Sequence, residues 1–149
     1  MNLHLFIFYK DQAEDGPRLK ELAQKVAEAK LTSRVHFTGP QADLARTMAW
    51  LDLGIVPSTD SEVNCRVAVE FMAAGTPVVA FPTGALPEVV AKTGIICPKP
   101  AAQELAKAIG TLLKDKPGLD KLGLAAHNRV KECYNMENFG EKLENIYLS

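Results

Sequence analysis

The stretch Ser61–Ala80, SEVNCRVAVEFMAAGTPVVA, predicts a helix that ends abruptly and leads into a buried strand. The helix contains the apolar run Val67–Ala74, which a glycine and a proline terminate, and the strand Val78–Phe81 follows at once. Glu70 stands inside the apolar run. Because burying an ionised carboxylate without a partner is costly, this position predicts a polar ligand or a structural hydrogen-bond partner.

Short apolar runs and helical patterns alternate along the rest of the chain. Strands are expected at Leu3–Phe8, Val35–Thr38, Leu53–Val56, Val78–Phe81 and Gly94–Cys97. Helices are expected from Pro17 to about Ala27 and at Gln41–Trp50, Cys65–Ala74, Leu86–Val90, Ala101–Lys114, Leu119–Cys133 and Asn138–Leu148. Apolar strands separated by helices imply a parallel sheet covered on both faces. We therefore expect one Rossmann-like α/β domain, residues 1–149, with a helical C-terminal third.

Composition excludes several classes of function. The net charge of −1, with acids and bases mixed along the chain, argues against a nucleic-acid surface. No apolar run approaches the roughly 18 residues of a transmembrane helix, and the first residues lack the pattern of a signal peptide. Three widely spaced cysteines predict reduced thiols in a cytoplasmic protein, with neither a disulfide framework nor a metal site.

Ligands of such a sheet bind at the carboxyl ends of the strands. The candidate loops are Tyr9–Asp15, Thr38–Pro40, Pro57–Asn64 and Pro82–Leu86. Asn64 is the expected N-cap of the helix after the third of these loops, where the amides near Cys65 and the positive charge of Arg66 suit a phosphate or diphosphate. The alternative is ordinary strand–loop–helix geometry without a ligand.

Two glutamates and a glycine complete the candidate site. Glu70 can accept two hydroxyl groups, as on a ribose, or cap neighbouring backbone; Glu62 can contact a ligand or be simply solvated. Gly84 permits a close backbone approach to a ligand, and Glu88 can either contribute to the site or favour the dipole of its own helix.

Six ordered segments resemble the donor-binding, C-terminal half of a retaining glycosyltransferase of family 4, which has the GT-B fold. They are RVHFTG (34–39), D-x-x-x-V-P-S (52–58), E-x7-E (62–70), MAAGTPVVA (72–80), GALPEVV (84–90) and TGIICP (93–98). The flanks, Leu3–Leu22 and Arg129–Tyr147, resemble the family more weakly.

The resemblance implies a role for each candidate residue. Glu70 would hold the ribose hydroxyls of a nucleoside-diphosphate sugar, and Glu62 the hydroxyls of the transferred sugar. The amides of Asn64, Cys65, Arg66 and Val67 would take the diphosphate, Thr38 and Gly39 would flank the base, and Ser58 and Gly84 would complete the donor site. Neither a cofactor nor a metal is expected, because amides and basic side chains stabilise the leaving diphosphate in that family.

The departures from the family concern the loops and the chain length. Val63-Asn64-Cys65 replaces the usual Gly-Phe-Gly, and Tyr9–Pro17 replaces a Gly-x-Gly-Pro loop. The family's first strand–helix unit, with its basic residues, and the N-terminal acceptor domain are both expected to be missing. We therefore expect an inactive fragment, cut naturally or by design. The missing strand would leave unpaired edges on the strands Leu3–Phe8 and Leu53–Val56. We expect these two strands to pair directly with each other, to receive a strand from a second copy, or to have been excised from a longer protein. The missing half could make a peripheral membrane contact.

The alternative reading is a non-catalytic Rossmann-like nucleotide-binding or regulatory module. A receiver-type domain fits poorly, since Pro57-Ser58 ends a central strand without the required aspartate and Phe81-Pro82-Thr83, at the end of the next strand, has no lysine. A dinucleotide oxidoreductase also fits poorly, because no G-x-G-x-x-G follows a strand. A degenerate, purely binding form of the transferase half stays open.

Overall fold

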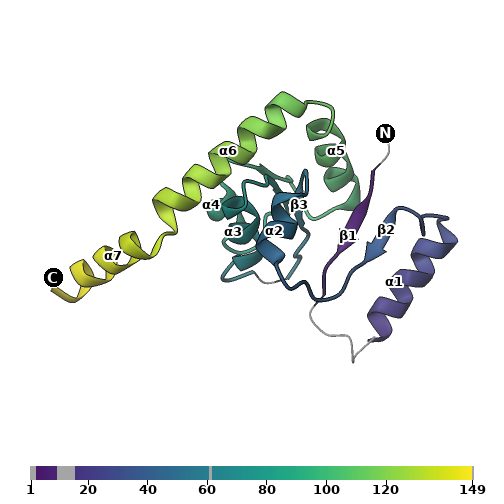
Figure 1. Cartoon of the computed structure of the whole chain (residues 1–149), viewed down its shortest axis with the longest axis horizontal. Helices are drawn as coiled ribbons and strands as arrows, with labels where there is room; N and C mark the ends of the chain where they lie inside the picture. The colour runs from purple at the N-terminus through teal and green to yellow at the C-terminus, as the bar shows by residue number, and fades with distance from the viewer. Residues whose placement is uncertain (1–2, 10–15, 61, 149) are drawn as a thin grey trace. The chain divides into compact units, whose positions relative to one another are not determined.

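A computed structural model of the protein describes residues 3–9, 16–60 and 62–148. The chain forms two compact units, Met1–Leu44 and Ala45–Ser149, which we call the first and the second unit. Figure 1 shows the ribbon of the chain, coloured from the N-terminus to the C-terminus. Among the residues that the structure describes, no helix is both long and apolar enough to cross a membrane.

The first unit contains one βαβ arrangement. β1 (Leu5–Ile7) and β2 (Val35–Phe37) are parallel, with Leu5 opposite Val35, and α1 (Pro17–Glu28) connects them. Pro17 occupies the first turn of α1, where the missing N–H costs nothing. No side chain of α1 is buried, although Leu19 and Val26 of its predicted apolar stripe are half-buried.

The second unit is a three-stranded parallel sheet with the order β3-β4-β5. Gly54 lies opposite Val78, and Val79 lies opposite Ile95. The strands are β3 (Gly54–Val56), β4 (Val78–Ala80) and β5 (Ile95–Ile96), and the helices are α2 (Leu44–Ala49, which begins at the end of the first unit), α3 (Arg66–Ala73), α4 (Leu86–Val90), α5 (Ala102–Leu112), α6 (Lys116–Cys133) and α7 (Met136–Leu148). These parallel α/β elements and the helical C-terminal third confirm the expected fold class.

Helices cover both faces of the β3–β5 sheet. On one face Val79 and Phe81 pack with Leu112 of α5 and Leu119 of α6. On the other face α3 lies so close that a Cβ on Gly54 would stand 2.6 Å from the ring of Phe71. The middle strand β4 is completely buried as a result, with Val78, Val79 and Ala80 each at 0% exposure. Because the three strands are parallel and packed on both faces, their carboxyl ends lie at one fixed edge of the sheet.

Two helices begin earlier than the sequence indicates. α6 begins at Lys116 instead of Leu119, because the Asp115 side chain accepts a hydrogen bond from the Gly118 amide at 3.0 Å and caps the first turn. α7 begins at Met136 instead of Asn138, and the Asn135 side chain accepts from the Asn138 amide at 2.6 Å. In both cases a hydrogen bond to a short polar side chain stabilises the first turn, so the helix includes residues that precede its predicted start.

The strands form two sheets, whereas the sequence predicts one. Among the described strands, β1 pairs with β2 in the first unit, and β3 pairs with β4 in the second. In β3 the amide of Gly54 and the carbonyl of Val56 bond toward β4. Alternate residues of a strand point their backbone groups in opposite directions, so Ile55 directs its own away from β4.

Candidate functional site

The segments that follow β3 and β4 meet at the carboxyl edge of the second unit's sheet. The amide of Ala85 donates to the backbone carbonyl of Glu62 at 3.1 Å. The hydroxyl of Thr83 donates to the backbone carbonyl of Ser58 at 2.6 Å. These contacts confirm that Glu62 and Gly84 lie at the same edge of the sheet, as parallel strands require.

The Glu62 carboxylate is engaged on both oxygens. Ser58 Oγ donates to Oε2 at 2.9 Å, and the amide of Cys65 donates to Oε1 at 3.1 Å. Glu62 is half-buried. It is therefore not simply solvated: it orders the segment that leads into α3, with its charge beside the positive end of the helix dipole.

Gly84 makes the close backbone approach that the sequence predicts, and the group it approaches is a part of the protein. Its φ is +54°, and a Cβ on this residue would stand 2.2 Å from the carbonyl oxygen of Glu62. Only glycine combines this backbone conformation with this distance at low cost. Gly84 thereby fixes the two segments against each other.

The beginning of α3 differs from the sequence prediction. Cys65, not Asn64, is the N-cap, with φ at +47° and no side-chain cap hydrogen bond. The upstream Glu62 carboxylate takes the Cys65 amide, which leaves Asn64 outside the helix. Cys65 is 1% exposed, and burial, followed by the charge of Glu62, raises the pKa of its thiol. Arg66 and Val67, the first residues of the helix, are both exposed.

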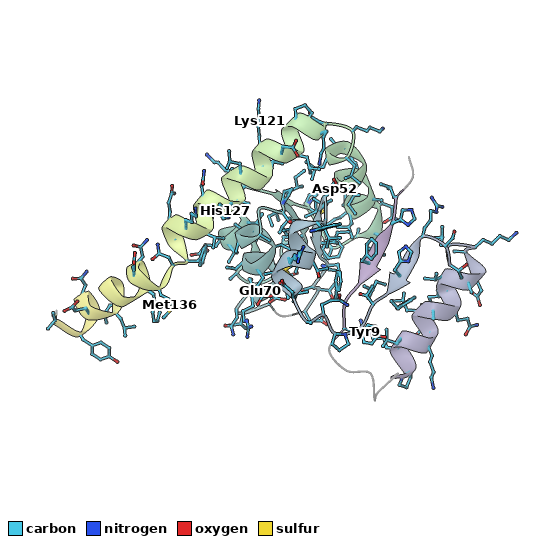
Figure 2. The ribbon with its side chains drawn as sticks, in the orientation of Figure 1. Tyr9, Asp52, Glu70, Lys121, His127 and Met136 are labelled. Carbon is cyan, nitrogen blue, oxygen red and sulfur yellow. The ribbon has the colours of Figure 1, made fainter. Side chains whose placement is uncertain are left out.

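Glu70 lies on the flank of α3, and the prediction that its carboxylate is buried is wrong. Ala68, Phe71 and Met72 are the buried residues of α3, so the helical period places Glu70 at the boundary with solvent. Figure 2 labels Glu70 among the side chains of the second unit. Its side chain is 39% exposed and pairs with Arg66, with Nη2 and Oε1 3.2 Å apart. The structural partner that the sequence left open is therefore Arg66, and the carboxylate stays accessible to a ligand.

Thr38 and Gly39 belong to the first unit, and the other predicted site residues belong to the second. Thr38 closes the end of β2, where both its amide and its hydroxyl donate to the carbonyl of Ile7, at 3.0 and 3.1 Å. Gly39 is buried, with φ at +60°. Residues 10–15 of the candidate loop Tyr9–Asp15, and Ser61, lie outside the described residues.

Thr83 is the residue that the sequence analysis missed. It is 8% exposed, and its hydroxyl bonds to Ser58 across 25 positions of sequence. The available signal was a polar residue between the end of a buried strand and a glycine, in Phe81-Pro82-Thr83-Gly84. Glu88 is exposed on the first turn of α4.

Other features of the surface contain none of the predicted site residues. A depression of about 580 Å³ is lined by Ala91, Lys92, Thr93, Ala125, Asn128, Arg129 and Glu132. Among residues 3–9, 16–60 and 62–148, no cluster of three or more His, Cys, Asp or Glu side chains could hold a metal ion.

Comparison with known proteins gives a consistent picture. The family described as glycosyl transferases group 1 matches residues 8–115. The 2-deoxystreptamine glucosyltransferase of Streptomyces kanamyceticus is 37% identical over 105 residues, which are 68% of this chain and 27% of that protein. The N-acetyl-alpha-D-glucosaminyl L-malate synthase of Bacillus anthracis is 31% identical over 89% of this chain and 35% of its own length. The chain thus spans about a third of the length of these curated relatives.

Solved structures agree along nearly the whole chain. Anabaena Alr3699/HepE in complex with UDP matches 97% of this chain and 40% of its own, with a TM-score of 0.89 and 28% identity. Sucrose-phosphate synthase from Thermosynechococcus elongatus matches 97% of this chain and 37% of its own, with a TM-score of 0.85 and 31% identity. Together with the family match over residues 8–115, these likenesses show that the chain belongs to the glycosyl transferases group 1 family.

Proposed function

We propose that this chain is the donor-binding half of a retaining, family 4 glycosyltransferase that uses a nucleoside-diphosphate sugar. The observation that carries the proposal is the joined carboxyl edge of β3 and β4, where Glu62 and the first turn of α3 occur together with an accessible Glu70. The Anabaena relative, whose structures are with UDP and with UDP-glucose, supports a nucleotide sugar as the ligand.

Each group in the proposed site meets one part of the donor. The first amides of α3 have no hydrogen-bond partner within the helix and form the positive end of its dipole. A negatively charged diphosphate suits this position. Arg66, 83% exposed at that end, adds positive charge. Glu70 accepts the ribose hydroxyls, and Glu62 accepts hydroxyls of the transferred sugar. The proposal assigns no step to a metal or cofactor.

Transfer requires more than these 149 residues. A transferase must hold donor and acceptor together and keep water from the reacting bond. Because the chain spans only 27% and 35% of the two relatives above, we propose that the acceptor is bound by a further domain and that the isolated chain binds donor without transferring sugar. Robust transfer by the 149-residue chain, in an assay with several nucleotide sugars and acceptors, would refute this part of the proposal.

Titration calorimetry with UDP tests the ribose role of Glu70. Glu70→Ala removes a charged hydrogen-bond acceptor, so we expect affinity to fall about 5- to 150-fold, equivalent to about 1–3 kcal/mol. Glu21→Ala is a matched control, because Glu21 also forms an exposed i,i+4 ion pair, with Lys25 at 2.6 Å, but lies on α1. Equal UDP affinity in wild type and Glu70→Ala would contradict the assignment.

A further inference from the structure

A relay of hydrogen bonds connects a buried threonine to the Glu62 carboxylate. Thr83 Oγ1 donates to the backbone carbonyl of Ser58 at 2.6 Å, and the hydroxyl of the same Ser58 donates to Glu62 Oε2 at 2.9 Å. The Ala85 amide donates to the backbone carbonyl of Glu62 at 3.1 Å. The position of Glu62 thus depends on the segment after β4 as well as on its own.

Thr83 is placed to act on this relay and not on a ligand. Its exposure is 8%, and its hydroxyl proton is directed at the Ser58 carbonyl. The adjacent Gly84 permits the two segments to lie this close, because a Cβ at that position would stand 2.2 Å from the carbonyl oxygen of Glu62. A shift of Ser58 would carry its hydroxyl away from Glu62 and release one of the two contacts that hold the carboxylate.

We propose that Thr83 is a positioning residue that fixes the Glu62 carboxylate through Ser58 and thereby sets the preference for a nucleotide sugar over the bare nucleotide. The inference rests on the proposed function, in which Glu62 accepts hydroxyls of the transferred sugar. Thr83 contacts neither the sugar nor the nucleotide. Its effect should be larger on ligands that reach Glu62 than on the bare nucleotide, because Glu62 accepts the sugar hydroxyls directly and meets α3 only through the Cys65 amide.

The test compares UDP and UDP-glucose by titration calorimetry on the full chain. Thr83→Val keeps a similar volume and removes the hydroxyl, so we expect UDP-glucose affinity to fall about 3- to 10-fold more than UDP affinity, the scale of one hydrogen bond. Thr83→Ser retains the hydroxyl and should restore the ratio. Thr76→Val is the matched control, since Thr76 is 2% exposed and its hydroxyl donates to the Met48 carbonyl at 2.7 Å.

The ratio of the two affinities decides the outcome. A selective loss in Thr83→Val, absent from Thr76→Val and rescued by Thr83→Ser, supports the proposal. An unchanged ratio in Thr83→Val, or an equal change in the Thr76 control, overturns it. Should Thr83→Val fail to fold, Ser58→Ala breaks the relay at its next step, and an unchanged ratio in that variant overturns the proposal equally.

Amide hydrogen exchange separates failure of the inference from failure of the proposed function. The amides of Cys65 and Ala85 both bond to Glu62, so both should exchange faster in Thr83→Val than in wild type and Thr76→Val. If the wild type binds neither UDP nor UDP-glucose, the proposed function fails. Faster exchange then still supports the positioning of Glu62 by Thr83, and unchanged exchange overturns it.

Discussion

Replacing Gly84 by alanine should disrupt the edge of the sheet where the two segments meet. Gly84 has a φ of +54°, and a Cβ there would stand 2.2 Å from the Glu62 carbonyl oxygen. Non-bonded carbon atoms normally lie about 3.5 Å from their neighbours, so the two segments must separate by about 1 Å or more. That movement pulls the Glu62 carbonyl away from the Ala85 amide, which now donates to it at 3.1 Å.

Two terms set the size of the effect. An L-residue in the left-handed region costs roughly 1–2 kcal/mol. Loss of the Ala85–Glu62 hydrogen bond costs about 0.5–1.5 kcal/mol more. We therefore expect Gly84→Ala to lower the free energy of unfolding by about 1.5–3.5 kcal/mol. With a urea dependence of about 2 kcal/mol per molar, the midpoint of unfolding falls by about 0.8–1.8 M.

Gly75→Ala separates the two terms. Gly75 has a φ of +79°, but its Cβ would meet no atom within 4 Å, so only the backbone cost applies. Urea unfolding followed by circular dichroism should show a clearly smaller loss for Gly75→Ala. Equal losses in the two variants, or no loss in Gly84→Ala, would refute the argument that contact with Glu62 requires glycine at position 84.

Four further predictions concern the helices and thiols of the second unit. Arg129→Lys should destabilise the unit by about 1–3 kcal/mol in urea unfolding, because the guanidinium donates to two carbonyls of α4 at 2.8 and 2.7 Å and an ammonium cannot reproduce that fork. The amides of α7 should exchange much faster than those of α6, since the described apolar side chains of α7 are largely exposed and a helix of this length gains most of its stability from packing; equal protection in the two helices would contradict this reasoning. A thiol reagent at pH 8 should label the exposed Cys133 first, because burial raises the pKa of Cys65 and Cys97. The unfolded thiols ionise first, so stability should fall as pH rises above about 8.5, and less so in a variant that lacks both buried thiols.

The order of the elements could be predicted because hydrophobic period and chain breakers mark them locally. Gly75 and Pro77 separate α3 from β4 in the sequence as they do in the structure. The exposure of Glu70 could not be predicted in the same way. The run Val67–Ala74 is apolar on all sides except at Glu70, so the sequence does not show which arc faces the core. Packing against the sheet selects Ala68, Phe71 and Met72 and leaves Glu70 beside solvent.

The finer geometry of the site depends on contacts between segments distant in sequence. Cys65 replaces Asn64 as the N-cap because a carboxylate three residues upstream takes its amide. The bond from Thr83 to Ser58 spans 25 positions, and no local pattern encodes it. The expectation of one continuous sheet also depended on which strands pair, which hydrophobic period does not specify.

The contacts of Glu62 within the protein are compatible with its proposed role toward a sugar. An ionised carboxylate offers about four lone-pair positions, two on each oxygen. Ser58 occupies one position on Oε2, and the Cys65 amide occupies one on Oε1. One position on each oxygen is therefore left for the two hydroxyls of a sugar, and neither protein contact has to break. A carboxylate already held by the protein loses less freedom when it binds, so these bonds preorganise Glu62 instead of competing with the ligand. On this account Ser58→Ala weakens sugar binding because it loosens Glu62, even though Ser58 need not touch the sugar.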